Sequence, residues 1–286
     1  MRLGTYVLGD AAARPAVIAD ERVYDIGAHL PDAPSTMIGL LEALDTWRAQ
    51  LQALPQIAGW HALSEVRLLA PVPRPGKILA LGLNYRDHAA EANMALPEVQ
   101  TWFAKMPTAT NSPYGDVHLP RVSTKLDYEA ELAIVIGTRA KHVVREQARQ
   151  AIAGYCCAND VSVRDWQLRT TQFVVGKSFD THCPFGPWIL TADEIADPQA
   201  LGIRCSVNGE QRQNSNTREM VFDVFAMIEH LSQAMTLEPG DVILTGTPAG
   251  VGAVSKPPRY LAAGDVVRVE IDGIGAIENR VIDEPR

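Results

Sequence analysis

Three acidic residues, Asp127, Glu129 and Glu131, stand at alternate positions in the stretch KLDYEAELAIVIG, directly before its most apolar part. Successive side chains of a strand point to opposite faces, so Glu129 and Glu131 are predicted to share one face. The other face would carry Tyr128, Ala130, Leu132, Ile134 and Ile136. Two like charges this close repel each other, and burying them is costly unless a positive charge lies between them. A divalent cation would supply that charge.

A third carboxylate, Asp160, ends the apolar segment AIAGYCCAND further along the chain. Together the three carboxylates form an all-oxygen ligand set, the type that suits Mg²⁺ or Mn²⁺, with Ca²⁺ as a substitute. The alternative is that Glu129 and Glu131 line a solvated face and Asp160 caps a helix near Ser162, because acidic residues are usually exposed. Spacing alone does not decide between the two interpretations.

A histidine and a glutamate follow an apolar stretch in LGLNYRDHAAEANM. His88 and Glu91 are three positions apart, so they are neighbours if the segment is a helix. A carboxylate beside an imidazole orients the ring and raises its basicity, which suits the pair to deprotonating water. A pair on the exposed face of an amphipathic helix would have the same spacing.

Cationic and amide side chains come soon after Asp160, in the stretch DVSVRDWQLRTTQFVVGKSF. Beside a metal site, Arg164, Gln167 and Lys177 could hold the carboxylate of an anionic substrate. Alternatively, Arg164 pairs with Asp165 at the surface, and Lys177 is only a salt-bridge partner of a metal-site glutamate.

The stretch ILTGTPAGVG offers Thr245, Thr247 and a glycine-rich turn. Its hydroxyl and backbone N–H groups could meet a substrate oxygen. The stretch lacks the GxxxxGK[ST] pattern of a phosphate-binding loop, and a simple tight turn is equally consistent with it.

Seven separated motifs, in this order, resemble the fumarylacetoacetate hydrolase family from about Lys77 to the C-terminus: GLNYRDHAAE, DYEAELAIVIG, CCANDVSVRDWQ, GKSFDTHCPFGPWI, VNGEQRQ, LEPGDVILTGTPAGVG and GDVVRVEIDGIGAIENRV. The match is to bacterial two-domain members that act on acylpyruvate-like or diketo-acid substrates. The resemblance implies a mixed β-roll catalytic domain, usually dimeric, with a catalytic Mg²⁺ or Mn²⁺. By position it implies metal ligands at Glu129, Glu131 and Asp160, a water-activating pair at His88 and Glu91, and substrate contacts at Arg164, Gln167, Lys177 and Thr247.

The reaction that this resemblance implies is hydrolysis of a 2,4-dioxo acid, an acylpyruvate or a diketo sugar acid, to pyruvate and a carboxylic acid. A water deprotonated by His88 with help from Glu91 would add to the C4 carbonyl. Lys177 would stabilise the enolate that leaves. The same enolate serves oxaloacetate decarboxylases, hydratases and isomerases, so these stay open. A metal-stabilised binding or structural protein is the distant alternative, but such a protein needs neither His88, Glu91 nor Lys177.

Several elements must position these residues. Three short strands are expected at RLGTYVL, PAVIAD and RVYDI, then a helix in STMIGLLEALDTWRAQLQAL capped by Ser35 or Thr36. Three prolines and a glycine in LAPVPRPGKILALG predict a boundary near residue 70, giving a small N-terminal α/β domain over 1–70 and a catalytic domain over 71–286. Helices are expected in REQARQAIAGY, SVRDWQLRT and REMVFDVFAMIEHLSQAM, and hairpins at Asn208-Gly209 and between Asp272 and Gly275. Because strands and helices do not alternate regularly, we predict a β-rich α+β fold.

Composition excludes several classes of protein. The 286 residues carry a formal net charge of −8, so no general basic surface attracts nucleic acid or anionic lipid. The first residues lack a signal-peptide core, and no stretch approaches the ~18 apolar residues of a membrane span, so a cytoplasmic location is expected. The four cysteines include an adjacent pair and no CxxC, which indicates buried thiols in a reducing compartment. The partners that the family resemblance implies are a small anionic dioxo acid and a second copy of the chain in a homodimer.

Overall fold

The computed structural model describes residues 1–286 and is built on a 12-stranded mixed sheet. Its main path runs β4-β3-β2-β1-β14-β12-β11-β17-β6-β7, while β5 pairs with β1 and β8 with β14. The two ends of the path, β4 and β7, do not pair with each other, so the sheet is not a closed barrel. The strands are β1 (Arg2–Val7), β2 (Arg14–Ala19), β3 (Arg22–Asp25), β4 (His61–Ala62), β5 (Arg67–Leu69), β6 (Ile78–Gly82), β7 (Thr101–Lys105), β8 (Thr110–Asn111), β11 (Ala130–Ile136), β12 (Ile152–Asn159), β14 (Cys183–Thr191) and β17 (Val242–Leu244).

A 5-stranded sheet in the order β16-β15-β18-β19-β9 and a two-stranded pair, β10-β13, complete the β structure. Their bounds are β9 (Val117–Leu119), β15 (Gly202–Val207), β16 (Glu210–Asn216), β18 (Val266–Ile271), β19 (Gly275–Asp283), β10 (Leu126–Asp127) and β13 (Ser162–Val163). Both expected hairpins are confirmed: Asn208 and Gly209 link β15 to β16 with positive φ angles of 53° and 78°, and residues 272–274 link β18 to β19. The predicted β-rich α+β class is confirmed.

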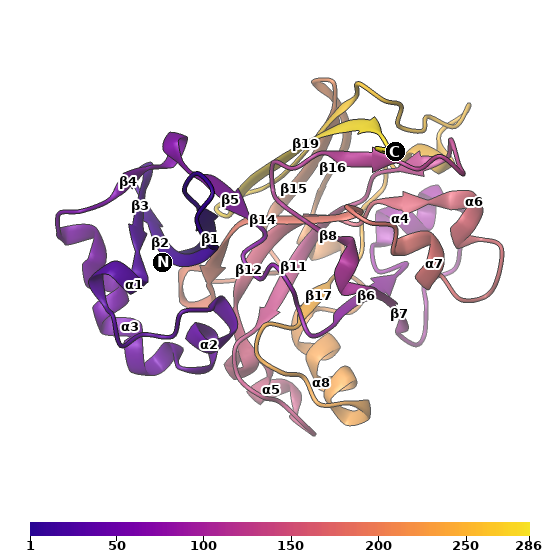
Figure 1. The fold of residues 1–286 in the computed structure, drawn as a ribbon. Helices are drawn as coiled ribbons and strands as arrows, with labels where there is room; N and C mark the ends of the chain where they lie inside the picture. The colour runs from indigo at the N-terminus through magenta and orange to yellow at the C-terminus, as the bar shows by residue number, and fades with distance from the viewer.

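The α-helices are short and lie around the sheets. They are α1 (Ile26–His29), α2 (Met37–Glu42), α3 (Leu44–Ala53), α4 (Arg86–Glu91), α5 (Arg145–Ala148), α6 (Arg164–Gln167), α7 (Val174–Lys177) and α8 (Val224–Ala234). In Figure 1 the indigo N-terminal strands and α1–α3 lie at one end of the molecule, and α4, α6 and α7 gather at the other. No helix has the length and apolar character needed to cross a membrane.

Three helix predictions need correction. The expected single helix after Thr36 is two helices, because the chain turns at Ala43 (φ −107°, ψ 16°) so that both α2 and α3 pack on the same core. The helix expected in REQARQAIAGY ends by Ala151, since Ile152 begins β12, which is paired on both edges. Pairing with β10 likewise makes Ser162 and Val163 a strand, so the helix expected in SVRDWQLRT is limited to α6.

Two apolar cores bury the two faces of β11. Leu132, Ile134 and Ile136 belong to a core of 37 residues that includes residues of the smaller sheet and of α8. Ala133 and Val135 point the other way, into a core of 26 residues shared with α2 and α3. The predicted alternation is therefore confirmed, but neither face of β11 meets water.

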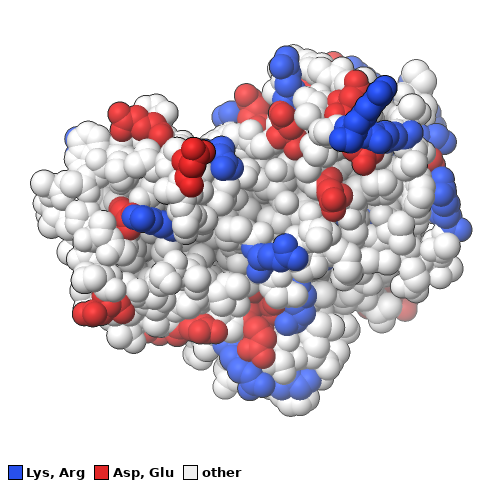
Figure 2. Space-filling model, in the orientation of Figure 1, with Lys and Arg blue, Asp and Glu red and all other residues white.

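The first seventy residues continue the main sheet, because β1 pairs with β14 as well as with β2 and β5. All four cysteines are free and buried, as the sequence indicates. Charged side chains of both signs are interspersed on the face shown in Figure 2. The domain division at residue 70, the homodimer and the cytoplasmic location stay predictions.

Candidate active site

Strand register brings the three predicted metal carboxylates together. In the antiparallel pair of β11 and β12, Ala130 lies opposite Asn159, so Asp160 comes next to Glu129. The backbone N–H of Asp160 donates to the carbonyl oxygen of Glu129 at 2.9 Å. Oxygens of Glu129, Glu131 and Asp160 all lie within 4.8 Å of one another. Two segments that are distant in sequence thus build one oxygen cluster.

All three carboxylates are buried, with exposed fractions of 6% or less. Burial, followed by repulsion from Asp160 and Glu129, raises the pKa of Glu131 well above its usual value. Burial alone would also raise the pKa of Glu129, but Lys177 and Arg164 outweigh it and lower that pKa to about 2. The interpretation of Glu129 and Glu131 as a solvated face is therefore wrong.

Two buried lysines hold Asp160. Lys177 Nζ lies 2.7 Å from Glu129 Oε2 and 2.7 Å from Asp160 Oδ2, and Lys105 Nζ lies 2.6 Å from Asp160 Oδ1. Ser162, where a helix was expected to begin in the alternative interpretation, lies on β13. Asp160 is therefore bound by two ammonium groups and does not cap a helix.

Arg164, at the start of α6, is held by two carboxylates. Its Nε donates to Asp127 Oδ2 at 2.8 Å, and its Nη1 lies 2.6 Å from Glu129 Oε1 and 3.0 Å from Gln167 Oε1. Its Nη2 is buried with no partner. The alternative surface pair with Asp165 is not formed, because Asp165 instead accepts from Ser123 Oγ at 2.6 Å. Arg164 therefore keeps unused N–H donors.

The charges of this region do not balance. Four buried carboxylates, Asp127, Glu129, Glu131 and Asp160, meet three buried cations, Lys105, Arg164 and Lys177. Glu131 is the carboxylate without a cation, and its Oε2 accepts only the backbone N–H of Gly246, at 2.6 Å. A buried charge without a counter-charge is costly. The oxygen cluster therefore fits a divalent cation, which would pair with Glu131 and with ligands of the type that Mg²⁺ and Mn²⁺ prefer.

The predicted His–Glu pair lies on α4 beside this cluster. His88 Nδ1 is 3.4 Å from Glu91 Oε2, and both Glu91 oxygens accept the backbone N–H of Gly250 at 3.0 Å. His88 is mostly buried and Glu91 about a third exposed, with side-chain exposures of 15% and 30%. Glu91 therefore links the imidazole to the glycine-rich loop after β17.

One cavity of about 310 Å³ collects most of the predicted residues. His88, Glu129, Glu131, Arg164, Gln167, Lys177 and Thr247 all line it. Its remaining wall is mainly apolar and includes Phe103, Met94, Pro97, Leu168 and Phe173. Asp160 and Glu91 lie behind the wall, where they contact Lys177 and His88. The structure thus brings the predicted residues together, while their roles stay predictions.

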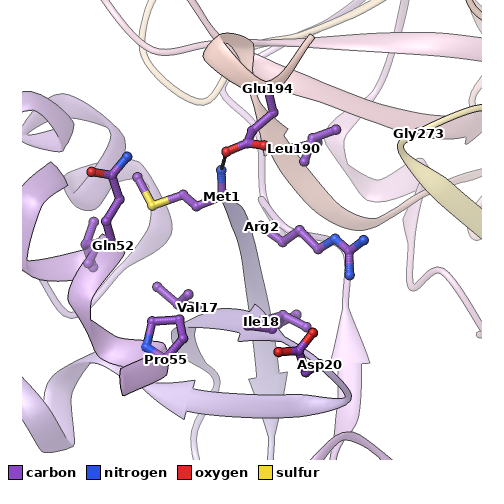
Figure 3. A pocket seen from close by; sticks show the side chains of 12 residues that line it. Met1, Arg2, Val17, Ile18, Asp20, Gln52, Pro55, Leu190, Glu194 and Gly273 are labelled. Carbon is purple, nitrogen blue, oxygen red and sulfur yellow. Dashed lines mark hydrogen bonds and ion pairs between the residues drawn. The ribbon is translucent and has the colours of Figure 1, made fainter. Parts of the chain in front are cut away.

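A larger cavity of about 450 Å³ lies elsewhere, between α3, the start of β1 and the end of β14 (Figure 3). Three of its charged groups interact within the protein: the amino group of Met1 contacts Thr191 Oγ1 at 2.7 Å and Glu194 at 2.9 Å, and Arg2 stacks on Trp188. It contains no histidine and no cluster of three carboxylates. The smaller cavity therefore holds the chemistry.

Three further residues of the site escaped the sequence analysis: Lys105, Asp127 and Gln213. All are at most 1% exposed. Lys105 ends the strand TWFAK, and Asp127 accepts N–H groups of Gly252 and Ala253 as well as Arg164. A charged residue that ends an apolar strand was the available signal for Lys105. Gln213 ends the motif VNGEQRQ, but its partners are distant in sequence and nothing in the motif indicates its contacts.

The chain is similar in sequence and in structure to several known enzymes. Residues 77–282 match the family model of the fumarylacetoacetate (FAA) hydrolase C-terminal domain. The mitochondrial oxaloacetate tautomerase fahd2 of Xenopus laevis is 46% identical over 266 residues, which cover 91% of this chain and 82% of that protein. A crystal structure of maleylpyruvate hydrolase from Sphingobium sp., in complex with manganese (II) ion and pyruvate, is 36% identical with a TM-score of 0.85 over 100% of both chains. The fumarylacetoacetate hydrolase of Exiguobacterium antarcticum is 36% identical with a TM-score of 0.88, covering 99% of this chain and 100% of that one.

Proposed function

This chain belongs to the fumarylacetoacetate hydrolase family, and within it we propose an enzyme that depends on a divalent metal and acts on a 2-oxo acid through its enolate. The proposed reaction is keto–enol tautomerisation of oxaloacetate. The identity of 46% to an oxaloacetate tautomerase supports this choice of substrate. Mn²⁺ is the proposed metal because the similar maleylpyruvate hydrolase structure contains it, with Mg²⁺ as the alternative.

One observation carries the proposal. In a single cavity, a buried oxygen cluster with an unpaired carboxylate, Glu131, faces two cationic side chains that retain free N–H groups. An ammonium group has three donors, and Lys177 gives two of them to Glu129 and Asp160. Arg164 keeps its Nη2 donors. Such a site favours an anionic ligand that also supplies oxygen atoms.

The chain's own residues bind the substrate and stabilise the charge that develops. The free N–H groups of Arg164, with the nearby Gln167, hold the substrate carboxylate in a geometry that a planar guanidinium favours. The remaining N–H of Lys177 meets the C2 oxygen, where negative charge develops as the enolate forms. A divalent cation held by Glu129, Glu131 and Asp160 would act as a Lewis acid toward the same enolate.

His88 moves the proton. In the keto-to-enol direction its imidazole takes a proton from C3 as the C2–C3 double bond forms, and the imidazolium then returns that proton to the C2 oxygen. The reverse sequence restores the ketone. Glu91 orients the ring through Nδ1, which leaves Nε2 for the transfer. Because the pair is tied to Gly250, the loop after β17 sets the position of the imidazole.

Hydrolysis of a 2,4-dioxo acid to pyruvate and a carboxylic acid is the second candidate, and the apolar end of the cavity favours it. A four-carbon diacid offers no apolar group to contact Met94, Leu168 and Phe173, whereas an acylpyruvate with an alkyl or aryl group does. In this reaction His88 would take a proton from water, which then adds to C4.

The two candidates separate in one experiment on the full chain. The chain is stripped with a chelator and reloaded with Mn²⁺. Loss of the ultraviolet absorbance of enol-oxaloacetate then reports tautomerisation, and release of pyruvate from a series of acylpyruvates and diketo sugar acids reports hydrolysis. Pyruvate formed from oxaloacetate is scored separately, because it would indicate decarboxylation. The proposal expects metal-dependent loss of the enol. Metal-dependent hydrolysis without enol loss would favour the second candidate, and the absence of both activities would contradict both candidates.

A further inference from the structure

The side-chain amide of Gln213 has only one orientation that satisfies its neighbours. Its Oε1 accepts the backbone N–H of Ala130 at 2.9 Å, and its Nε2 donates to the carbonyl oxygen of Pro248 at 2.9 Å. A backbone N–H can only donate and a carbonyl oxygen can only accept. Turning the amide over would therefore lose both bonds in a region where Gln213 is 1% exposed. Ala130 is the residue between the two cluster glutamates, so the amide joins the strand end to the glycine-rich loop.

This fixed amide also determines the hydrogen-bonding role of Thr247. The second N–H of Gln213 Nε2 donates to Thr247 Oγ1 at 2.8 Å. The Thr247 hydroxyl accepts that bond and donates to no protein group. Thr247 is only 5% exposed, and it lines the cavity. Thr245 differs, because its hydroxyl donates to the carbonyl oxygen of Leu132 at 2.9 Å. Of the two threonines in the loop, only Thr247 keeps a proton for a ligand.

We propose that Gln213 is a positioning residue that makes the Thr247 hydroxyl a dedicated donor to an oxygen of the bound substrate. The oxygen that it recognises is an acceptor, a carboxylate or enolate oxygen. The inference rests on the proposed function, because it needs an anionic oxo acid in this cavity. It adds a link between substrate recognition and the metal strand, since the same amide holds Ala130 and Thr247.

The test measures binding of oxalate, a planar dianion with the shape of an enolate of pyruvate, to the Mn²⁺-loaded chain by calorimetry. Thr247→Val removes the hydroxyl at nearly constant volume and is expected to weaken oxalate binding about 10-fold to 100-fold, the value of one hydrogen bond to a charged group. Thr247→Ser keeps the hydroxyl and should stay close to wild type. Gln213→Met removes the amide at similar length and should lose about as much as Thr247→Val.

The double variant decides the matter. If Gln213 acts through Thr247, adding Gln213→Met to Thr247→Val causes little further loss, because the group that it positions is already absent. The inference would be overturned if the losses of affinity of the two single variants multiplied in the double variant. A Gln213→Met variant with wild-type oxalate affinity, or a Thr247→Ser variant that binds as weakly as Thr247→Val, would overturn it as well. Gln213→Glu is a second variant in case the methionine destabilises the loop: its carboxylate would accept the Thr247 proton, and the same loss is expected.

Titration with Mn²⁺ alone separates this inference from the proposed function. A folded wild-type chain that binds neither Mn²⁺ nor oxalate would contradict the proposed function. A chain that binds both, with no coupling between Gln213 and Thr247, would overturn only the positioning role. Thermal unfolding of each metal-free variant verifies that it is folded.

Discussion

Glu131 lies in the same oxygen cluster as Glu129, yet only Glu129 has cationic partners, Lys177 and Arg164. The difference follows from position: Glu129 precedes β11 and faces α6 and α7, whereas Glu131 lies within β11 and meets the backbone of Gly246. The cluster is therefore asymmetric, with one carboxylate, Glu131, that lacks a counter-charge.

The first prediction concerns this unpaired charge. Glu131→Gln should weaken Mn²⁺ binding by about 100-fold or more, since even residues that only support metal ligands contribute 10–100-fold. The same change should raise the unfolding temperature of the metal-free chain, because the raised pKa of Glu131 means that folding must protonate a carboxylate that is ionised in the unfolded chain, and Gln removes this cost. Mn²⁺ should stabilise the wild type but not the variant.

Calorimetry and thermal unfolding measure both effects, and Glu238→Gln at an exposed carboxylate is the matched control. A variant that binds Mn²⁺ as tightly as the wild type would remove Glu131 from the metal site.

The second prediction concerns the proton-transfer residue. His88→Ala should lower turnover of oxaloacetate enol, and of any acylpyruvate, by about 10²–10⁴-fold, the usual contribution of a positioned base. Mn²⁺ affinity should stay nearly unchanged, because His88 is not in the oxygen cluster. Decarboxylation of oxaloacetate, if present, should suffer less, since loss of CO₂ needs no base.

Rates are compared with metal affinity on the same samples. A His88→Ala variant with wild-type turnover, or one that loses Mn²⁺ binding together with turnover, would show that His88 has another role.

The third prediction separates two lysines that both contact Asp160. Lys105 has only Asp160 and the carbonyl oxygen of Val161 as hydrogen-bond partners and does not line the cavity. Lys105→Met should therefore act through Asp160 and weaken Mn²⁺ binding about 10–100-fold. At saturating Mn²⁺ most of its turnover should return.

Lys177→Met should not recover in this way, because Lys177 lines the cavity and is the residue that we propose to contact the substrate oxygen. Metal titrations of activity on both variants test the contrast, and recovery of both variants would place Lys177 in a purely structural role.

The sequence predicts the strand face of Glu129 and Glu131 because alternation is a local property of any strand. It also predicts the hairpin at Asn208-Gly209, since few other residues adopt two consecutive positive φ angles. It does not predict the turn at Ala43 between α2 and α3, because no glycine or proline marks it and the shared core produces it.

In the site, too, local patterns could be predicted from the sequence and long-range contacts could not. His88 and Glu91 are near in sequence, so their pairing could be anticipated from helical spacing. Lys105, Asp127 and Gln213 reach the site through side-chain contacts with residues that are distant in sequence, and a lone charged or amide residue is usually exposed. That Asp160 meets Glu129 depends on the register of β11 with β12, which single-sequence patterns do not specify.

The fourth prediction concerns stability at acid pH. Burial lowers the pKa of His182 to about 3, compared with 6.5 for a free histidine. Its Nε2 pairs with the carbonyl oxygen of His118 at 2.8 Å, and its buried Nδ1 has no acceptor for a second proton. Between these two pKa values the unfolded chain therefore binds more protons than the folded chain. The contribution of His182 to the free energy of unfolding is complete above about pH 6.5 and falls as the pH is lowered.

Urea unfolding of the metal-free chain between about pH 5 and about pH 6.5 measures this slope. His182→Phe, which can still stack on Phe179, should reduce it, while His142→Gln on the surface should not. An unchanged slope in His182→Phe would assign the acid sensitivity to other groups.

The central claim is that a divalent cation in the cluster of Glu129, Glu131 and Asp160 allows this chain to act on oxaloacetate through its enolate. The most direct measurement is the rate of enol-oxaloacetate loss with chelator-stripped chain, with Mn²⁺ alone, and with stripped chain to which Mn²⁺ is returned. The claim predicts a rate close to background in the first two samples and a rate proportional to enzyme in the third. A stripped chain as fast as the reloaded one, or a reloaded chain no faster than Mn²⁺ alone, would contradict it.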